Sequence, residues 1–289
     1  ILGGLAIKEN NQPEAEAIFR EVIEIKPQEL RAYLGLSGVL VQQGKTSEAE
    51  EVLRQALDID STALQPRMAL FRLYVNQKKF DRAQKELEAT IHAHPENPEL
   101  HLLLANFFFG LQKLEAAEAA YRRAIEVDPQ NSQSYMIVAA FYETTGRKDD
   151  ALAMYQEALA LQPEDILIRQ AIARHHYKYG DLAEAEKHIA QILKQRPQYF
   201  SARMLKGEIH VRKGEFAKAI AVFDRLIEEE PSSHPVHYFK GVAHLGKGET
   251  RLALAALTKA LEFKPDDIRA RLLIADIYLS QRDFNLAEK

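Results

Sequence analysis

The sequence predicts an all-α solenoid of stacked antiparallel helix pairs, and a fixed 34-residue period is the main reason. Stepping through the chain by this period from Ala15 to Ala49 and onward to Ala287 gives alanine at all nine positions. Seven of the eight positions spaced in the same way from Pro27 to Pro265 are proline, and Ser61 is the exception. A fixed period in this range is the signature of supersecondary units that stack on one another.

The repeating unit is clearest in residues 132–165. Apolar residues at helical spacing form one face before Gly146 and a second face after it. Pro163 ends the second face, because proline lacks an amide hydrogen and disfavours helix in the residue before it. The pattern therefore predicts two helices joined by a turn at Gly146. The equivalent turn positions are Gly44, Gly180, Gly214 and Gly248, with Asn10, Lys78, Gln112 and Arg282 in the other repeats.

The register divides the chain into about eight and a half repeats of a single array spanning residues 1–289. Because the chain starts in a first helix and ends in a second helix, without the polar capping helices that arrays need, we expect it to be a piece of a longer protein. Repeat 64–97 departs most from the pattern, since it follows Ser61 and carries Phe71 at a small position; it is either locally repacked or a bend. The repeats are 1–29 (partial), 30–63, 64–97, 98–131, 132–165, 166–199, 200–233, 234–267 and 268–289 (partial).

Composition excludes some classes of protein and site. The formal net charge of −4 argues against a general nucleic-acid binder, which is usually basic. The absence of cysteine excludes disulfides and thiolate metal sites, and it fits a cytoplasmic and a periplasmic or envelope location equally. No apolar run approaches the ~20 residues that span a membrane.

No pattern of residues indicates catalysis, a cofactor or a metal. There is no Ser-His-Asp order, no paired-carboxylate constellation and no HExxH motif. His176, His210 and His244 occupy one position in three successive repeats, which should place them at least ~8–10 Å apart, too far to share an ion. The sequence therefore predicts a non-enzymatic protein without cofactors.

The repeat resembles the tetratricopeptide repeat family over essentially the whole chain. Six residues match the family pattern of small, aromatic and proline positions in order: Ala139, Tyr142, Ala151, Tyr155, Ala158 and Pro163. The first-helix tryptophan of that pattern is absent, and tyrosine, arginine or histidine stands there instead. The resemblance implies a right-handed superhelix whose first helices line a concave face that binds extended peptides or helices of partner proteins.

Two features of that face are candidates for binding a partner. The fifth and twelfth positions of the repeats are mostly apolar, and residues 166–218 carry eleven Lys or Arg against five acids. The alternatives are ordinary seams between helices and a solvated charged face. The candidate partner-binding residues are Arg72, Asn106, Phe109, Met136, Gln170, Arg174, Tyr177, Lys178, Met204, Arg212 and Tyr238.

We therefore expect a protein-binding scaffold whose partner is an acidic and amphipathic peptide or helix. The uninterrupted register resembles bacterial scaffold proteins, including those of envelope secretion and exopolysaccharide assembly. One alternative is a substrate-presenting module of a larger enzyme whose catalytic domain lies outside this sequence. Another is end-to-end self-association through the uncapped ends.

Overall fold

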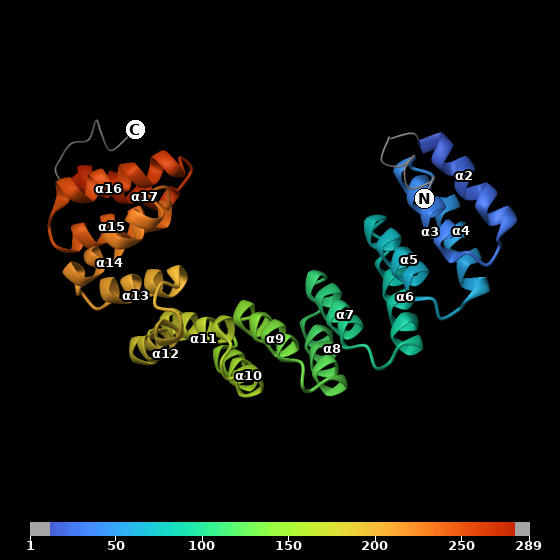
Figure 1. Cartoon of the computed structure of the whole chain (residues 1–289), viewed down its shortest axis with the longest axis horizontal. Coiled ribbons are helices and arrows are strands. Elements are labelled where there is room, and N and C mark those ends of the chain that lie inside the picture. The colour runs from blue at the N-terminus through green and yellow to red at the C-terminus, as the bar shows by residue number, and fades with distance from the viewer. Residues whose placement is uncertain (1–11, 281–289) are drawn as a thin grey trace. The chain divides into compact units, whose positions relative to one another are not determined.

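The protein is built from paired α-helices, as the computed structural model of residues 12–280 shows (Figure 1). Within that range there is no strand, and the all-α fold class predicted from the register is confirmed. The first helices of the pairs keep the predicted 34-residue period from each repeat to the next. They are α3 (Leu30–Gln42), α5 (Leu64–Asn76), α7 (Pro98–Gly110), α9 (Ser132–Thr144), α11 (Ile166–Tyr179), α13 (Phe200–Arg212), α15 (His234–Gly246) and α17 (Ile268–Ser280).

The second helices begin at the same regular interval. They are α2 (Gln12–Ile25), α4 (Thr46–Ile59), α6 (Phe80–Ala93), α8 (Leu114–Val127), α10 (Lys148–Leu161), α12 (Leu182–Gln195), α14 (Phe216–Glu229) and α16 (Thr250–Phe263).

A left-handed residue makes the turn inside each pair. The five glycines predicted for this turn, such as Gly180, have φ values of 74–92°, a conformation that glycine adopts without a steric penalty. Lys78 and Gln112 occupy the equivalent turns with φ of 57° and 60°. The turn is therefore fixed by its position in the repeat, even where the side chain is unfavourable.

Close packing within each pair explains the columns of small residues. All eight column alanines from Ala15 to Ala253 are completely buried, and Ala287 lies outside the described residues. A Cβ atom added at Gly207 would lie 2.4 Å from a ring carbon of Phe223 on the facing helix. Phe71 occupies the position equivalent to Gly207, and its ring packs edge-on against Phe107 of α7 at 5.6 Å between centroids.

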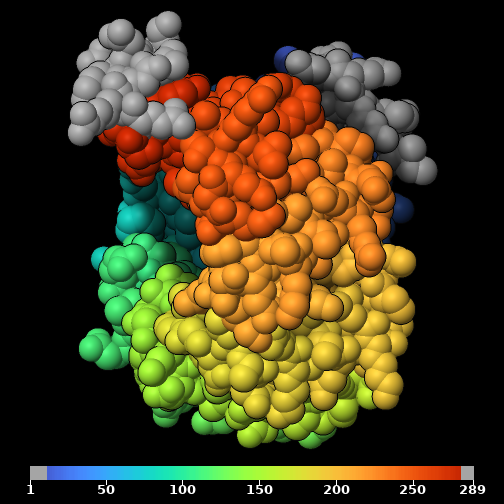
Figure 2. All heavy atoms as spheres, turned by 90° about the vertical axis from the view of Figure 1, so that its left-hand side faces the viewer, coloured from blue at the N-terminus to red at the C-terminus, as the bar shows by residue number. Residues whose placement is uncertain are grey.

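The chain divides into two compact units, Ile1–Ser134 and Tyr135–Lys289. In the first unit, a core cluster includes Leu40, Leu53, Leu70 and Leu87. In the second unit, successive helices contact one another in chain order from α11 to α17, and their surfaces adjoin from yellow through orange to red (Figure 2). The single continuous array remains a prediction.

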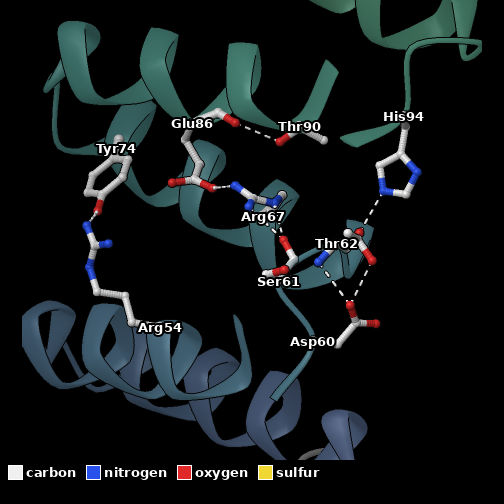
Figure 3. Close-up of polar contacts among 9 residues, drawn as sticks. All are labelled: Arg54, Asp60, Ser61, Thr62, Arg67, Tyr74, Glu86, Thr90 and His94. Atoms are coloured by element: carbon white, nitrogen blue, oxygen red, sulfur yellow. Dashed lines mark hydrogen bonds and ion pairs between the residues drawn. The ribbon is translucent and has the colours of Figure 1, made fainter. Parts of the chain in front are cut away.

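Polar contacts join the helices around Ser61, where the proline column is interrupted (Figure 3). Arg67 donates to the Ser61 carbonyl and also contacts Glu86 on α6 at 2.9 Å. The amide and hydroxyl of Thr62 both donate to Asp60, and Nε2 of His94 donates to the Thr62 carbonyl at 2.7 Å. These bonds hold the connection at Ser61, and repeat 64–97 keeps the regular helix pair of α5 and α6.

Candidate partner-binding face

A buried carboxylate lies at the centre of a polar cluster on the first helices of the second unit. Glu208 sits on α13 with 7% of its surface exposed. Burial raises the pKa of Glu208, while Arg174, a hydrogen bond from Tyr177, and Arg269 oppose that rise. The pKa of Tyr177 is raised to about 12 by burial and by the neighbouring Glu208 carboxylate. We call Arg174, Tyr177, Glu208, Arg212, Tyr238 and Arg269 the Glu208 cluster.

Two guanidinium groups of the Glu208 cluster are held against tyrosine rings. The Arg212 guanidinium lies 4.9 Å from the centre of the Tyr177 ring, and Arg212 also donates to the Tyr177 carbonyl oxygen. Arg269 lies 4.8 Å from the centre of the Tyr238 ring. Its Nε and Nη2 donate to the two carboxylate oxygens of Asp267 at 3.2 and 3.0 Å. Stacking and hydrogen bonding therefore orient both groups before any ligand arrives.

Arg174 is the cation of the Glu208 cluster that has no hydrogen-bonded or ion-paired partner among the described residues. Its side chain is exposed on α11. The nearby Glu208 charge is buried, and Asp267 is engaged by Arg269. Three guanidiniums thus face two carboxylates, which leaves an excess of positive charge suited to an incoming oxyanion.

Lys178, which the sequence placed beside Arg174, has an internal partner. Its ammonium group is bonded to Glu143, which also contacts the buried His175. Burial tends to raise the pKa of Glu143, but the bonds from Lys178 and His175 outweigh burial and hold it below its usual range. On the same helix, Oε1 of Gln170 is buried and has no hydrogen-bond partner in the described part of the chain.

The apolar candidates lie mainly in seams between helices. Met204 is only 6% exposed and packs in the core with Phe223. Met136 on α9 is half-buried, as is Tyr238 on α15. The structure therefore offers little methionine surface to a partner in the second unit.

Three candidate residues belong to the first unit. Arg72 on α5 is exposed and makes no hydrogen bond or ion pair with the residues that the structure describes. Asn106 on α7 accepts a hydrogen bond of 2.5 Å from the Tyr121 hydroxyl. Phe109 is half-buried on α7.

Sequence reasoning missed Glu208 and Arg269. One available signal was that Arg174 and Glu208 occupy the same repeat position in successive repeats, with opposite charges. Opposite charges at equivalent positions of adjacent first helices can meet across the seam. The contribution of Arg269 depends on the stacking of several repeats, which the sequence pattern did not reveal.

The aligned histidines bind acidic side chains of their own repeats. Nδ1 of His210 lies 2.6 Å from Glu215, and Nδ1 of His244 lies 2.7 Å from Glu249. Between residues 12 and 280 no group of three or more possible ligands is arranged to hold a metal ion. In the same range, no helix combines the length and hydropathy needed to cross a bilayer.

Two family models, both described as tetratricopeptide repeat, match most of the chain. One matches residues 68–132, 108–166, 171–234 and 239–289, and the other matches 6–60 and 40–94. The chain belongs to the tetratricopeptide repeat family. Its fold is that of a protein–protein interaction scaffold, and such repeats are typically non-catalytic.

Solved structures show the same tetratricopeptide fold at low sequence identity. The Cut9-Hcn1 hetero-tetramer of the APC/C is 18% identical with a TM-score of 0.55; the match covers 92% of this chain and 52% of that one, so this chain spans about half its length. PilW, described as a widely conserved type IV pilus biogenesis factor, is 20% identical with a TM-score of 0.57 over 66% of this chain and 89% of its own. The human IFIT1 dimer with m7Gppp-AAAA is 22% identical with a TM-score of 0.50 over 96% and 70%. A comparison with curated protein sequences finds no significant match.

Proposed function

We propose that this tetratricopeptide repeat protein is a non-enzymatic scaffold that binds an acidic segment of a partner protein at the Glu208 cluster. The observation that carries the proposal is the exposed guanidinium of Arg174, unpaired within the described residues, beside a second guanidinium, Arg212, that Tyr177 orients. Two guanidiniums on adjacent first helices can each form paired hydrogen bonds with a carboxylate. A peptide or helix with acidic side chains matches the charge of this face.

The Glu208 cluster favours an anionic ligand because its own carboxyl group is buried and does not face the solvent. The Glu208 carboxyl is buried under the tyrosine hydroxyl, and its raised pKa reflects the cost of holding charge there. An approaching carboxylate therefore encounters Arg174 and Arg212 first. Because Lys178 is neutralised by Glu143, the proposal rests on the two arginines.

The test is a binding assay with a library of acidic peptides and scrambled controls, selected on the wild type. Arg174→Glu/Arg212→Glu is expected to lose the selected peptides. Lys194→Glu/Arg196→Glu is the matched control, since both residues are exposed in the same unit and neither side chain makes a hydrogen bond or ion pair within the described residues. Wild-type affinity should fall as salt rises, because exposed charges are screened. Equal binding by the two double variants would overturn the proposal.

A bacterial envelope, secretion or exopolysaccharide assembly is the setting we propose for this scaffold, on the strength of its regular register. Fractionation of the source cells tests this setting. The alternative role, presenting substrates to a catalytic domain of a longer chain, is decided by the full-length sequence. Self-association is tested by light scattering, where a constant monomer mass across concentrations excludes it.

A further inference from the structure

A pocket in the second unit is lined by residues of α12, α13 and α14 and of the connection between α12 and α13. Its volume is about 450 Å3. Three cationic residues line it, Arg203 and Lys206 from α13 and Arg225 from α14, together with the apolar Leu193 and Val222. None of these residues belongs to the Glu208 cluster.

Two of the three cations are unpaired among the described residues. Arg203 is paired with Glu229, which also lines the pocket, at 2.7 Å. Lys206 and Arg225 are exposed and make no hydrogen bond or ion pair to any residue between 12 and 280. Glu228 adds a second, exposed carboxylate at the rim. The pocket therefore carries three positive and two negative charges.

The next repeat shows what Lys206 lacks. Lys240 occupies the same position one repeat later, and its ammonium group lies 2.6 Å from Asp224 of α14. The residue equivalent to Asp224 in α12, the second helix of the preceding repeat, is Ala190. The acid that would neutralise Lys206 is thus missing at the junction that holds the pocket.

Arg225 adds to this uncompensated charge. In the preceding repeat its position is held by Gln191, which accepts a hydrogen bond from Arg169. Arg225 replaces this glutamine acceptor with a cation, and Arg203 donates to Glu229 instead. Two guanidiniums and an ammonium group consequently line one hollow with an aliphatic wall, which suits a phosphate or carboxylate carried on a small apolar group.

We propose that this pocket is an anion-binding site, independent of the Glu208 cluster, that takes a phosphate or carboxylate group through Lys206, Arg225 and Arg203. The same oxyanion chemistry can come from a free anion or from a side chain of a bound peptide. The assay therefore uses separate arms with inorganic phosphate, citrate and a phosphoserine peptide.

The test is calorimetric titration of the whole chain with each probe at low salt. Wild type should bind at least one probe, and Lys206→Gln/Arg225→Gln should weaken that binding by about tenfold or more for each charge removed. Lys194→Gln on α12 is the matched control, because Lys194 does not line the pocket. Phosphate binding alone assigns the site to free anions, whereas binding of the peptide with a stronger affinity assigns it to a partner.

A second variant tests the same idea without removing a cation. Ala190→Asp supplies Lys206 with the acid that Lys240 already has, and Ala190 is exposed, so the fold tolerates it. Anion binding should weaken in this variant, and the acylation rate of Lys206, followed by mass spectrometry, should no longer fall when the probe is added. No binding of any probe by wild type, or equal binding by wild type and both pocket variants, would overturn the proposal.

Discussion

Arg67 donates two hydrogen bonds to the carbonyl oxygen of Ser61, from Nε at 2.9 Å and from Nη2 at 2.6 Å. The same hydrogen bond recurs in other repeats, where the side chain of the fourth residue of the repeat donates to the carbonyl oxygen of the proline six residues earlier. The Tyr33 hydroxyl donates to Pro27 at 3.0 Å, and Nε2 of His237 donates to Pro231 at 2.8 Å. These polar side chains stand where the family pattern has tryptophan, and they satisfy a carbonyl just past the end of a second helix.

Arg67→Met should destabilise the protein by about 2 kcal/mol, because the Ser61 carbonyl and the Glu86 carboxylate both lose a charged donor. The measurement is the urea midpoint of unfolding. Arg72→Met is the matched control on the same helix, where an exposed residue without polar contacts among the described residues should change stability by less than about 0.5 kcal/mol. Equal losses in the two variants would contradict this role of Arg67.

Glycine-to-alanine changes should have opposite signs at two helical positions. Gly207→Ala should destabilise by more than about 1 kcal/mol, because its Cβ would lie 2.4 Å from the Phe223 ring. Gly38→Ala should stabilise by about 0.5–1 kcal/mol, since nothing lies within 4 Å of its Cβ and alanine favours helix. Thermal unfolding of each variant checks the signs, and Gly207→Ala/Phe223→Leu should recover part of the loss.

Glu208→Gln should make the protein more stable at neutral pH. Because the pKa of Glu208 is raised in the folded state, folding binds a proton, and its contribution to stability falls as pH rises above the ordinary value of 4.5. The variant removes that fall, so it should match wild type at pH 4 and exceed it by about 1 kcal/mol at pH 7. Urea titrations at both pH values test this, with Glu228→Gln as an exposed control that should show no such difference.

Glu143→Gln should have the opposite pH dependence. The pKa of Glu143 is lowered, so its contribution is present above the ordinary 4.5 and is lost as pH falls through the lowered value. The variant should be less stable than wild type by about 1 kcal/mol at pH 7 and equal to it in strong acid. Lys178→Gln should reproduce the loss of stability at pH 7. The binding of acidic peptides should be unchanged in this variant, and a loss of binding would show that Lys178 belongs to the binding site.

The repeat register predicted the fold because packing in an array is local. The buried alanines and the left-handed turn at Gly180 each depend on contacts within one helix pair. Such features recur in every pair, so they are visible in the sequence as a regular period. The candidate site was only partly predictable. Lys178 and Glu143 are 35 residues apart, and Arg269 influences Glu208 from two repeats away, so their charges meet only after stacking.

The bond from the fourth residue of a repeat to the carbonyl six residues earlier limits how long the connection can be. At residues 27–33, 61–67, 231–237 and 265–271 the donor and acceptor are always six residues apart, although the donor is a phenol, a guanidinium or an imidazole. One inserted residue would displace the donor by up to ~3.5 Å, more than a hydrogen bond tolerates. These junctions therefore tolerate substitutions far more readily than insertions. This is a physical reason why each repeat keeps its length of 34 residues while the side chain that donates the bond varies.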